Sequence, residues 1–162
     1  MNEYLILALQ FIAVIFASLF YGMWNSAPRH TLIASSLLGM AGYIVYWFLL
    51  GTSEMLAFFL GTFTCCLLSE VCARFLKTPA TVLSFVAIIP IVPGIKLYNT
   101  MLAFAQNDMD GGLRLGVRTL AAAGCMALAI TVASLIGKHI ITPIGLMLSK
   151  KRTGFDSKVK RS

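Results

Sequence analysis

Long apolar stretches separated by short polar connections make up most of the chain. These stretches cover residues 4–24, 31–50, 54–75, 79–106 and 113–137. Each is about 20 residues or longer, the length that an α-helix needs to cross a bilayer core of about 30 Å. The pattern predicts an all-α integral membrane protein with five transmembrane helices. The apolar run that follows, up to residue 149, is too short to cross and is predicted to be an interfacial helix.

The fourth stretch is interrupted by two prolines and a glycine, which predicts a broken helix. Pro90 and Pro93 lack an N–H group and clash with the carbonyl four residues earlier, so a straight helix is disfavoured. Ile89 and Val92 precede these prolines and are expected to leave the α-helical region. Gly94 can take a positive φ without steric cost, which would let the chain change direction. Backbone N–H and C=O groups that lose their helical partners inside a bilayer must be buried in protein or line a water-filled cavity. The break is therefore a candidate substrate site.

The half-helix after the break has the features of an anion site. Its N-terminus would present unpaired N–H groups and the positive end of the helix dipole, and Lys96 adds a charge. The helix from the inner interface to the break is about eleven residues, or ~16 Å, so the break is expected roughly at the bilayer midplane. Broken helices of secondary transporters hold their substrates at this depth. A kinked structural helix with a paired or snorkelling lysine is the alternative. The predicted substrate-binding set is Pro90, Pro93, Gly94, Lys96, Tyr98, Asn99 and Thr100.

One narrow stripe of a helical wheel carries Lys96, Thr100, Ala103 and Asn107, so this side of the half-helix is expected to face a cavity or a partner helix. The third stretch has a different regularity, a small residue at every fourth position, which predicts a face for close helix packing. A shorter series in the fifth stretch, at Ala123 and Ala127, is weaker. The series in the third stretch is Ala57, Gly61, Cys65, Ser69 and Ala73.

The chain is 59% hydrophobic and 12% charged, with a net charge of +7, whereas a soluble domain is about a quarter charged. Basic side chains lie on alternate connections and acidic ones on the others, so the positive net charge reflects membrane topology rather than nucleic-acid binding. The positive-inside rule predicts an external N-terminus and a cytoplasmic C-terminus. Residues 1–149 are predicted to be one transmembrane domain and 150–162 a basic cytoplasmic tail. The basic set is Arg29, Arg74, Lys77 and Lys138 with the tail, and the acidic set is Glu3, Glu54, Asp108 and Asp110.

Local spacing predicts several polar contacts. Glu70 lies four residues before Arg74, which favours a structural ion pair over a proton relay. Arg114 and Arg118 are expected to pair with the acidic connection before them or to snorkel outward. Thr78 is expected to cap a helix that has Pro79 at its first position.

No chemistry-bearing motif is visible in the chain. The four cysteines lie in apolar stretches without a CxxC pair or a histidine at metal-ligand spacing, so they are predicted to pack, and no metal site or cofactor is expected. A nucleophile motif, a phosphate loop and a nucleotide fingerprint are also absent from the sequence. The sequence therefore disfavours an enzyme.

The string AIIPIVPGIKLYNTM resembles the threonine/serine exporter family, in particular the short subunit equivalent to the C-terminal half of full-length exporters. The shared pattern is Pro-x-x-Pro-Gly-x-x-x-Tyr, carried by Pro90, Pro93, Gly94 and Tyr98. The length, the five-span layout and the closing PIGLMLSKKR also match. Lys96 lies at a variable position of this pattern, so the resemblance assigns it no role.

The resemblance implies export of a small carboxylate across a bacterial inner membrane: threonine and serine or, in split two-subunit members, a dicarboxylate such as succinate. Ion gradients would drive it, with H+ as a possible coupling ion. A larger membrane subunit would supply the other half, and five crossings per half place two such halves in opposite orientations, as inverted repeats require. A non-transporting membrane scaffold for such a partner and a homo-oligomeric carrier are the alternatives.

Overall fold

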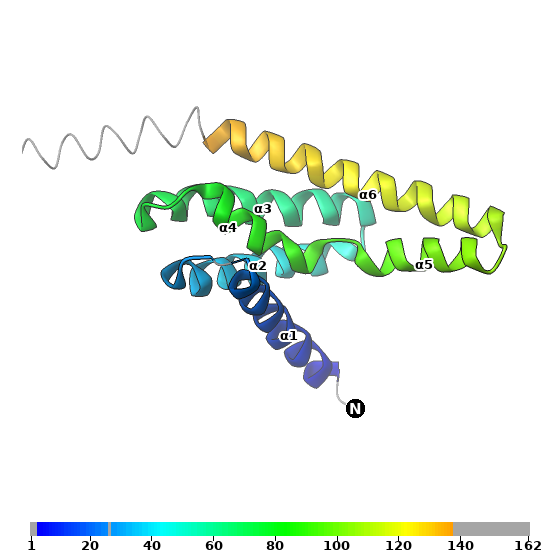
Figure 1. Ribbon diagram of the computed structural model, residues 1–162, viewed down its shortest axis with the longest axis horizontal. Helices are drawn as coiled ribbons and strands as arrows, with labels where there is room; N and C mark the ends of the chain where they lie inside the picture. Colours follow the sequence, from blue (N-terminus) through cyan, green and yellow to red (C-terminus); the bar gives the residue numbers. More distant parts are fainter. Residues whose placement is uncertain (1–2, 26, 138–162) are drawn as a thin grey trace, which may run out of the picture.

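The computed structural model describes residues 3–25 and 27–137, and this part of the chain consists of helices joined by short turns (Figure 1). The predicted all-α class is confirmed. The expected interfacial helix and basic tail lie outside the described residues. In order, the elements are α1 (Glu3–Trp24), α2 (Arg29–Leu50), α3 (Glu54–Leu76), α4 (Ala80–Ile88), the 3-10 turn η1 (Ile89–Ile91), α5 (Gly94–Ala105) and α6 (Met109–Ile136).

Four of the described helices, α1, α2, α3 and α6, are long and apolar enough to cross a membrane. The segment Ala80–Ile91 and the helix Gly94–Ala105 meet at an angle of 54°, and together they count as a fifth span if they cross as one unit. The predicted layout of four straight helices and one bent pair is therefore present.

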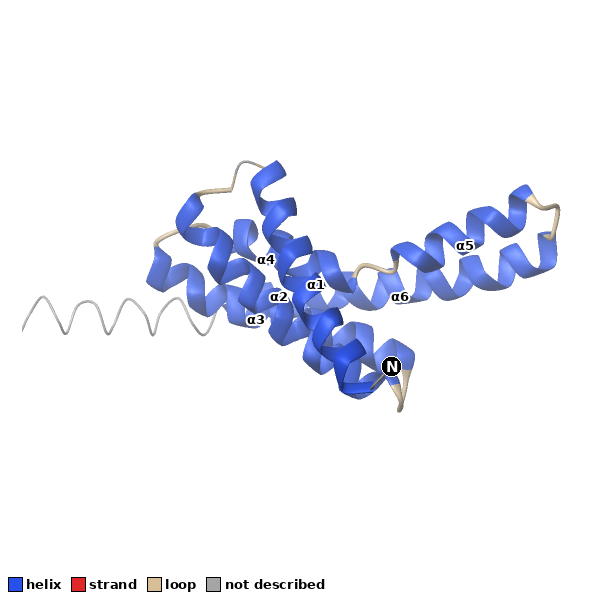
Figure 2. Cartoon of the chain, turned by 90° about the horizontal axis from the view of Figure 1, so that it is seen from below, coloured by secondary structure: helices blue, strands red, loops and turns tan. Residues whose placement is uncertain are grey.

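Helices α2, α3, α4 and α6 run roughly along the long axis of the molecule, and α1 crosses them obliquely (Figure 1). Helix α3 lies at the centre and packs against α2, α4 and α6. Helix α5 packs almost entirely against α6, and Figure 2 shows these two helices as a hairpin that extends away from the other helices. The bend between α4 and α5 thus separates a packed body from a projecting hairpin.

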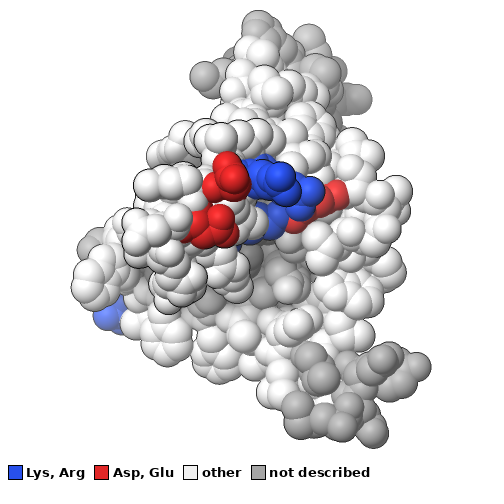
Figure 3. All heavy atoms as spheres, turned by 90° about the vertical axis from the view of Figure 1, so that its right-hand side faces the viewer, with Lys and Arg blue, Asp and Glu red and all other residues white. Residues whose placement is uncertain are grey.

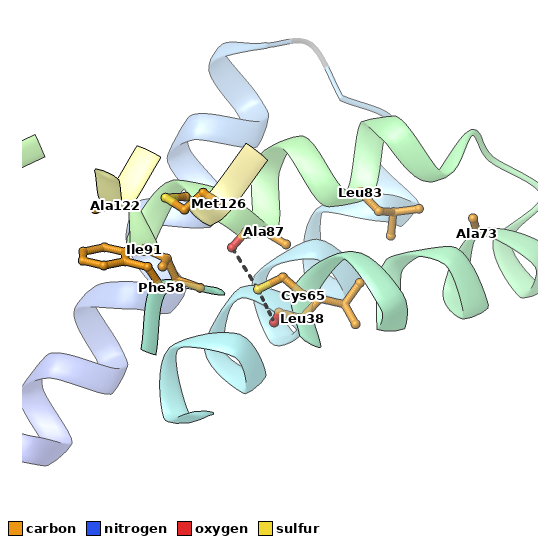
Figure 4. Close-up of a cluster of buried hydrophobic side chains, with 9 residues drawn as sticks. All are labelled: Leu38, Phe58, Cys65, Ala73, Leu83, Ala87, Ile91, Ala122 and Met126. Atoms are coloured by element: carbon orange, nitrogen blue, oxygen red, sulfur yellow. Dashed lines mark hydrogen bonds between the residues drawn. The ribbon is translucent and has the colours of Figure 1, made fainter. Parts of the chain in front are cut away.

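The core lies where α2, α3, α4 and α6 meet (Figure 4). Phe58, Leu83 and Ile91 are among its largest fully buried side chains. The thiol of Cys65 lies between two carbonyl oxygens, that of Leu38 at 3.4 Å and that of Ala87 at 3.6 Å. This cysteine therefore joins α2, α3 and α4 as a small packing residue with a weak donor.

The small residues of α3 are all buried, including Ala57, Gly61 and Ser69. A Cβ atom added to Gly61 would lie 2.9 Å from the Cβ of Tyr46 and 3.1 Å from the carbonyl oxygen of Gly42. Helices α2 and α3 therefore approach each other at backbone distance, which is the use expected of small residues. The weaker series at Ala123 and Ala127 is exposed.

Two helix starts differ from the sequence expectation. Pro79 is the N-cap of α4 (φ −59°, ψ 132°), not its first helical residue, and the Thr78 hydroxyl makes no capping bond. The reason is that Lys77 ends α3 in a left-handed conformation and leaves Pro79 extended. Helix α6 begins at Met109, inside the expected acidic loop, because the carboxylate of Asp108 accepts the N–H of Gly111 at 2.9 Å.

Candidate functional site

Three consecutive local structures form the backbone of the break. Pro90 lies in the 3-10 turn η1, which is closed by the Val92 N–H donating to the Ile89 carbonyl at 3.2 Å. Val92 is extended (φ −54°, ψ 130°). Pro93 (φ −75°, ψ 53°) is the centre of an inverse γ-turn in which the Gly94 N–H donates to the Val92 carbonyl at 2.7 Å. Helix α5 starts directly after this turn.

Two expectations about this backbone were wrong. Ile89 keeps α-helical angles (φ −48°, ψ −44°) although a proline follows it, because the helix tightens into the 3-10 turn instead of stopping. Gly94 does not take a positive φ, and none of the described glycines does. The change of direction comes from Val92 and Pro93, so the conformational freedom of Gly94 is not what bends the chain.

We therefore expect Gly94→Ala to be tolerated. A Cβ at this position would meet no atom within 4 Å, and alanine favours the helix that starts here. The free energy of unfolding should stay the same or rise by about 0.4–1 kcal/mol, because the unfolded chain loses freedom. Thermal unfolding in detergent measures this. A clear loss of stability would mean that a positive φ or a closer contact exists at Gly94.

The ammonium group of Lys96 reaches from the first turn of α5 to α3, where it forms an ion pair with Glu54. It also lies 5.2 Å from the centre of the Phe58 ring, a cation–π contact. The two charged side chains are partly buried, with exposed fractions of 27% for Lys96 and 37% for Glu54. Figure 3, which views the molecule from the right-hand side of Figure 1, shows most of the visible acidic and basic side chains gathered in one patch, with a separate basic group near the edge of the view.

The position of the break can be compared with α3. Ala87 contacts Cys65, the central residue of α3, whereas Lys96 contacts Glu54, the first residue of α3. The break thus begins near the middle of α3, and Lys96 lies level with its N-terminal end. If the middle of α3 lies at the bilayer midplane, the end of α4 lies near that level and Lys96 lies beyond it, because the 3-10 turn and the extended Val92 advance the chain further per residue than an α-helix does.

The predicted substrate-binding residues fall on two sides of α5. Thr100 is buried on the same side as Lys96, and its hydroxyl donates to the Lys96 carbonyl at 2.8 Å and lies 3.4 Å from the Thr119 hydroxyl. Tyr98 and Asn99 are exposed on other sides of the helix. Lys96 and Thr100 are therefore one turn apart on the same side of α5, and the two prolines precede this turn in the chain, whereas Tyr98 and Asn99 lie on exposed sides of the helix.

Sequence reasoning missed Glu54 and Phe58 as members of this site. From the sequence, Glu54 was placed only among the acidic residues of the connections that indicate membrane topology. The available signal was the cost of a lysine within an apolar span, which calls for a counter-ion. The chain has only six acidic residues, so the number of candidates was small.

Outside this site, one further ion pair occurs among the described residues. Glu70 and Arg74 form the predicted ion pair at 2.9 Å, and Arg74 also donates to the Gly137 carbonyl at 2.9 Å, which ties α3 to the end of α6. Within the described residues, Arg114 and Arg118 form no ion pair with Asp108 or Asp110. No group of three potential metal ligands occurs in this part of the chain.

A protein of several membrane-spanning helices, with a bent pair and a lysine–glutamate pair beside the bend, has the organisation of a membrane transporter. The family model described as Threonine/Serine exporter, ThrE, matches residues 10–136, and the chain belongs to this family. No curated protein and no solved structure matches the chain significantly. The family is one of membrane exporters, so exporter-type transport is the class of activity that it indicates for this chain.

Proposed function

We propose that this chain is the small subunit of a secondary exporter for a small carboxylate metabolite, either threonine and serine or a dicarboxylate such as succinate. The observation that carries the proposal is the break before α5, with Lys96 in the first turn of the restarted helix. The larger subunit would be equivalent to the N-terminal half of the exporter. The assembly would lie in a bacterial inner membrane, with H+ as a possible coupling ion.

The backbone at the start of α5 supports an anion site. The N–H groups of Gly94 and Leu97 donate to the carbonyls of Val92 and Pro93. Those of Ile95 and Lys96 have no such partner within the break, and a helix N-terminus offers groups of this kind to an anion. A substrate carboxylate could accept from them while the Lys96 ammonium neutralises its charge.

Exposed apolar side chains around the site support the proposal that α5 faces the larger subunit or the lipid bilayer. Ile95, Leu97 and Met101 are exposed on α5, and an almost wholly apolar hollow of about 300 Å³ lies between α5 and α6. Such a surface needs an apolar environment, which the larger subunit or the bilayer would supply.

The test is substrate flux in proteoliposomes that hold this chain together with the larger subunit purified from the same membranes. With radiolabelled threonine, serine and succinate as separate probes, Lys96→Met should reduce flux of the preferred probe by about two- to thirtyfold, the range for one favourable charge at a helix end. Lys96→Arg keeps the charge and serves as the control.

Vesicles that hold only one of the two subunits test the two alternative functions, the scaffold and the homo-oligomeric carrier. Full export by the larger subunit without this chain would overturn the transport assignment in favour of the scaffold. Export by this chain alone would identify a homo-oligomeric carrier. Wild-type flux in Lys96→Met would exclude Lys96 from the site.

A further inference from the structure

The ion pair between Glu54 and Lys96 places an acidic group at the position where the proposed substrate carboxylate would bind. It is one of two ion pairs between described residues, and the other lies within α3. Glu54 is the first residue of α3, whereas Lys96 is in the first turn of α5, so this pair joins the packed body to the projecting hairpin.

The Lys96 ammonium does not depend on Glu54 alone. The Phe58 ring below it is fully buried in the core and offers a fixed aromatic face to the cation. The ammonium can therefore remain in place when its carboxylate partner changes. The Glu54 side chain is the more exposed of the two, at 37%, and has room to move.

Among the described residues, Lys96 forms its ion pair with Glu54 and with no other carboxylate. A substrate carboxylate that displaces Glu54 from Lys96 leaves the Glu54 carboxylate without a cation, and a substrate ammonium group can supply that cation.

We propose that Glu54 determines specificity for zwitterionic amino acids over dicarboxylates. The substrate carboxylate replaces the Glu54 carboxylate on Lys96, and the released Glu54 binds the substrate ammonium. Binding then exchanges one internal ion pair for two ion pairs with the substrate. A dicarboxylate gains no partner at Glu54 and is repelled by it. This inference rests on the proposed function and selects one of its two substrate classes.

The experiment compares L-threonine with N-acetyl-L-threonine and succinate, which keep a carboxylate but lack the ammonium, in vesicles that hold the complete complex. The wild type should prefer threonine. Glu54→Gln, which keeps the shape but removes the charge, should reduce the threonine/N-acetylthreonine ratio of kcat/KM about tenfold and improve succinate transport. Flux is normalised to the subunit assembled in the membrane. Asp110→Asn removes an acidic charge that forms no ion pair in the described structure, and should leave the ratio unchanged.

Glu54→Asp keeps the charge and should retain the preference for threonine. If Glu54→Gln changed kcat/KM for all three probes by the same factor, Glu54 would be a structural tie and the inference would be wrong, while the proposed function stood. An equal loss of preference in Glu54→Asp and Glu54→Gln would also count against it, because charge would not be the cause. Absence of flux for every probe in the wild type would instead overturn the proposed function itself.

Discussion

The double substitution Pro90→Ala, Pro93→Ala should reduce substrate flux by at least about tenfold while the subunit still assembles. A proline inside a helix costs about 3 kcal/mol, so two alanines favour a continuous helix by about 6 kcal/mol. The partly exposed pair between Lys96 and Glu54 contributes only about 0–1 kcal/mol and cannot hold the bend against that difference. A straight helix would remove the turn at Val92 and Pro93 and turn Lys96 away from α3.

Flux is measured per subunit assembled in the membrane, and the bend is measured by the distance between spin labels placed on α4 and α5. Pro28→Ala is the matched control, since Pro28 is an exposed proline at the N-cap of α2, outside the break. Wild-type flux from a double variant whose helix had straightened would show that the break is only a structural kink. The assignment of a substrate site to it would then be abandoned.

Gly42→Ala should destabilise the subunit by about 1–3 kcal/mol, the usual cost of an overpacked core. A Cβ at this position would overlap the thiol of Cys65 and lie 2.8 Å from the carbonyl oxygen of Gly61. The backbone oxygen cannot rotate away, so α2 and α3 would have to separate. That separation would also disturb Ile91 at the end of η1, whose side chain would lie 3.3 Å from the added atom.

The control is the same substitution at Gly124, a helical glycine of α6 where an added Cβ meets nothing within 4 Å. Gly124→Ala should raise stability by up to about 1 kcal/mol through helix propensity. The measurement is the midpoint of unfolding of the purified subunit in mixed detergent. Equal midpoints for the two variants would contradict the close approach of α2 and α3.

Features that depend on neighbours along the chain could be predicted from the sequence. The apolar stretches predicted the helices, because a helix satisfies its own backbone hydrogen bonds. The two prolines located the bend, because each removes a donor whatever surrounds it. The pair between Glu70 and Arg74 followed from a separation of four residues, which sets neighbours on one face of a helix.

The tertiary structure decided the features that join distant parts of the chain. A lysine within an apolar span calls for a counter-ion, but Glu54 became the partner of Lys96 only because the bend brings α5 to the start of α3. The direction of the bend came from the angles of Val92 and Pro93 rather than from Gly94, since several turn conformations are open to this string and packing selects one of them. Local sequence thus determined where the helix breaks, because the causes are steric and lie within a few residues. Which groups meet at the break depended on helix packing, whose energy is shared among residues far apart in the chain.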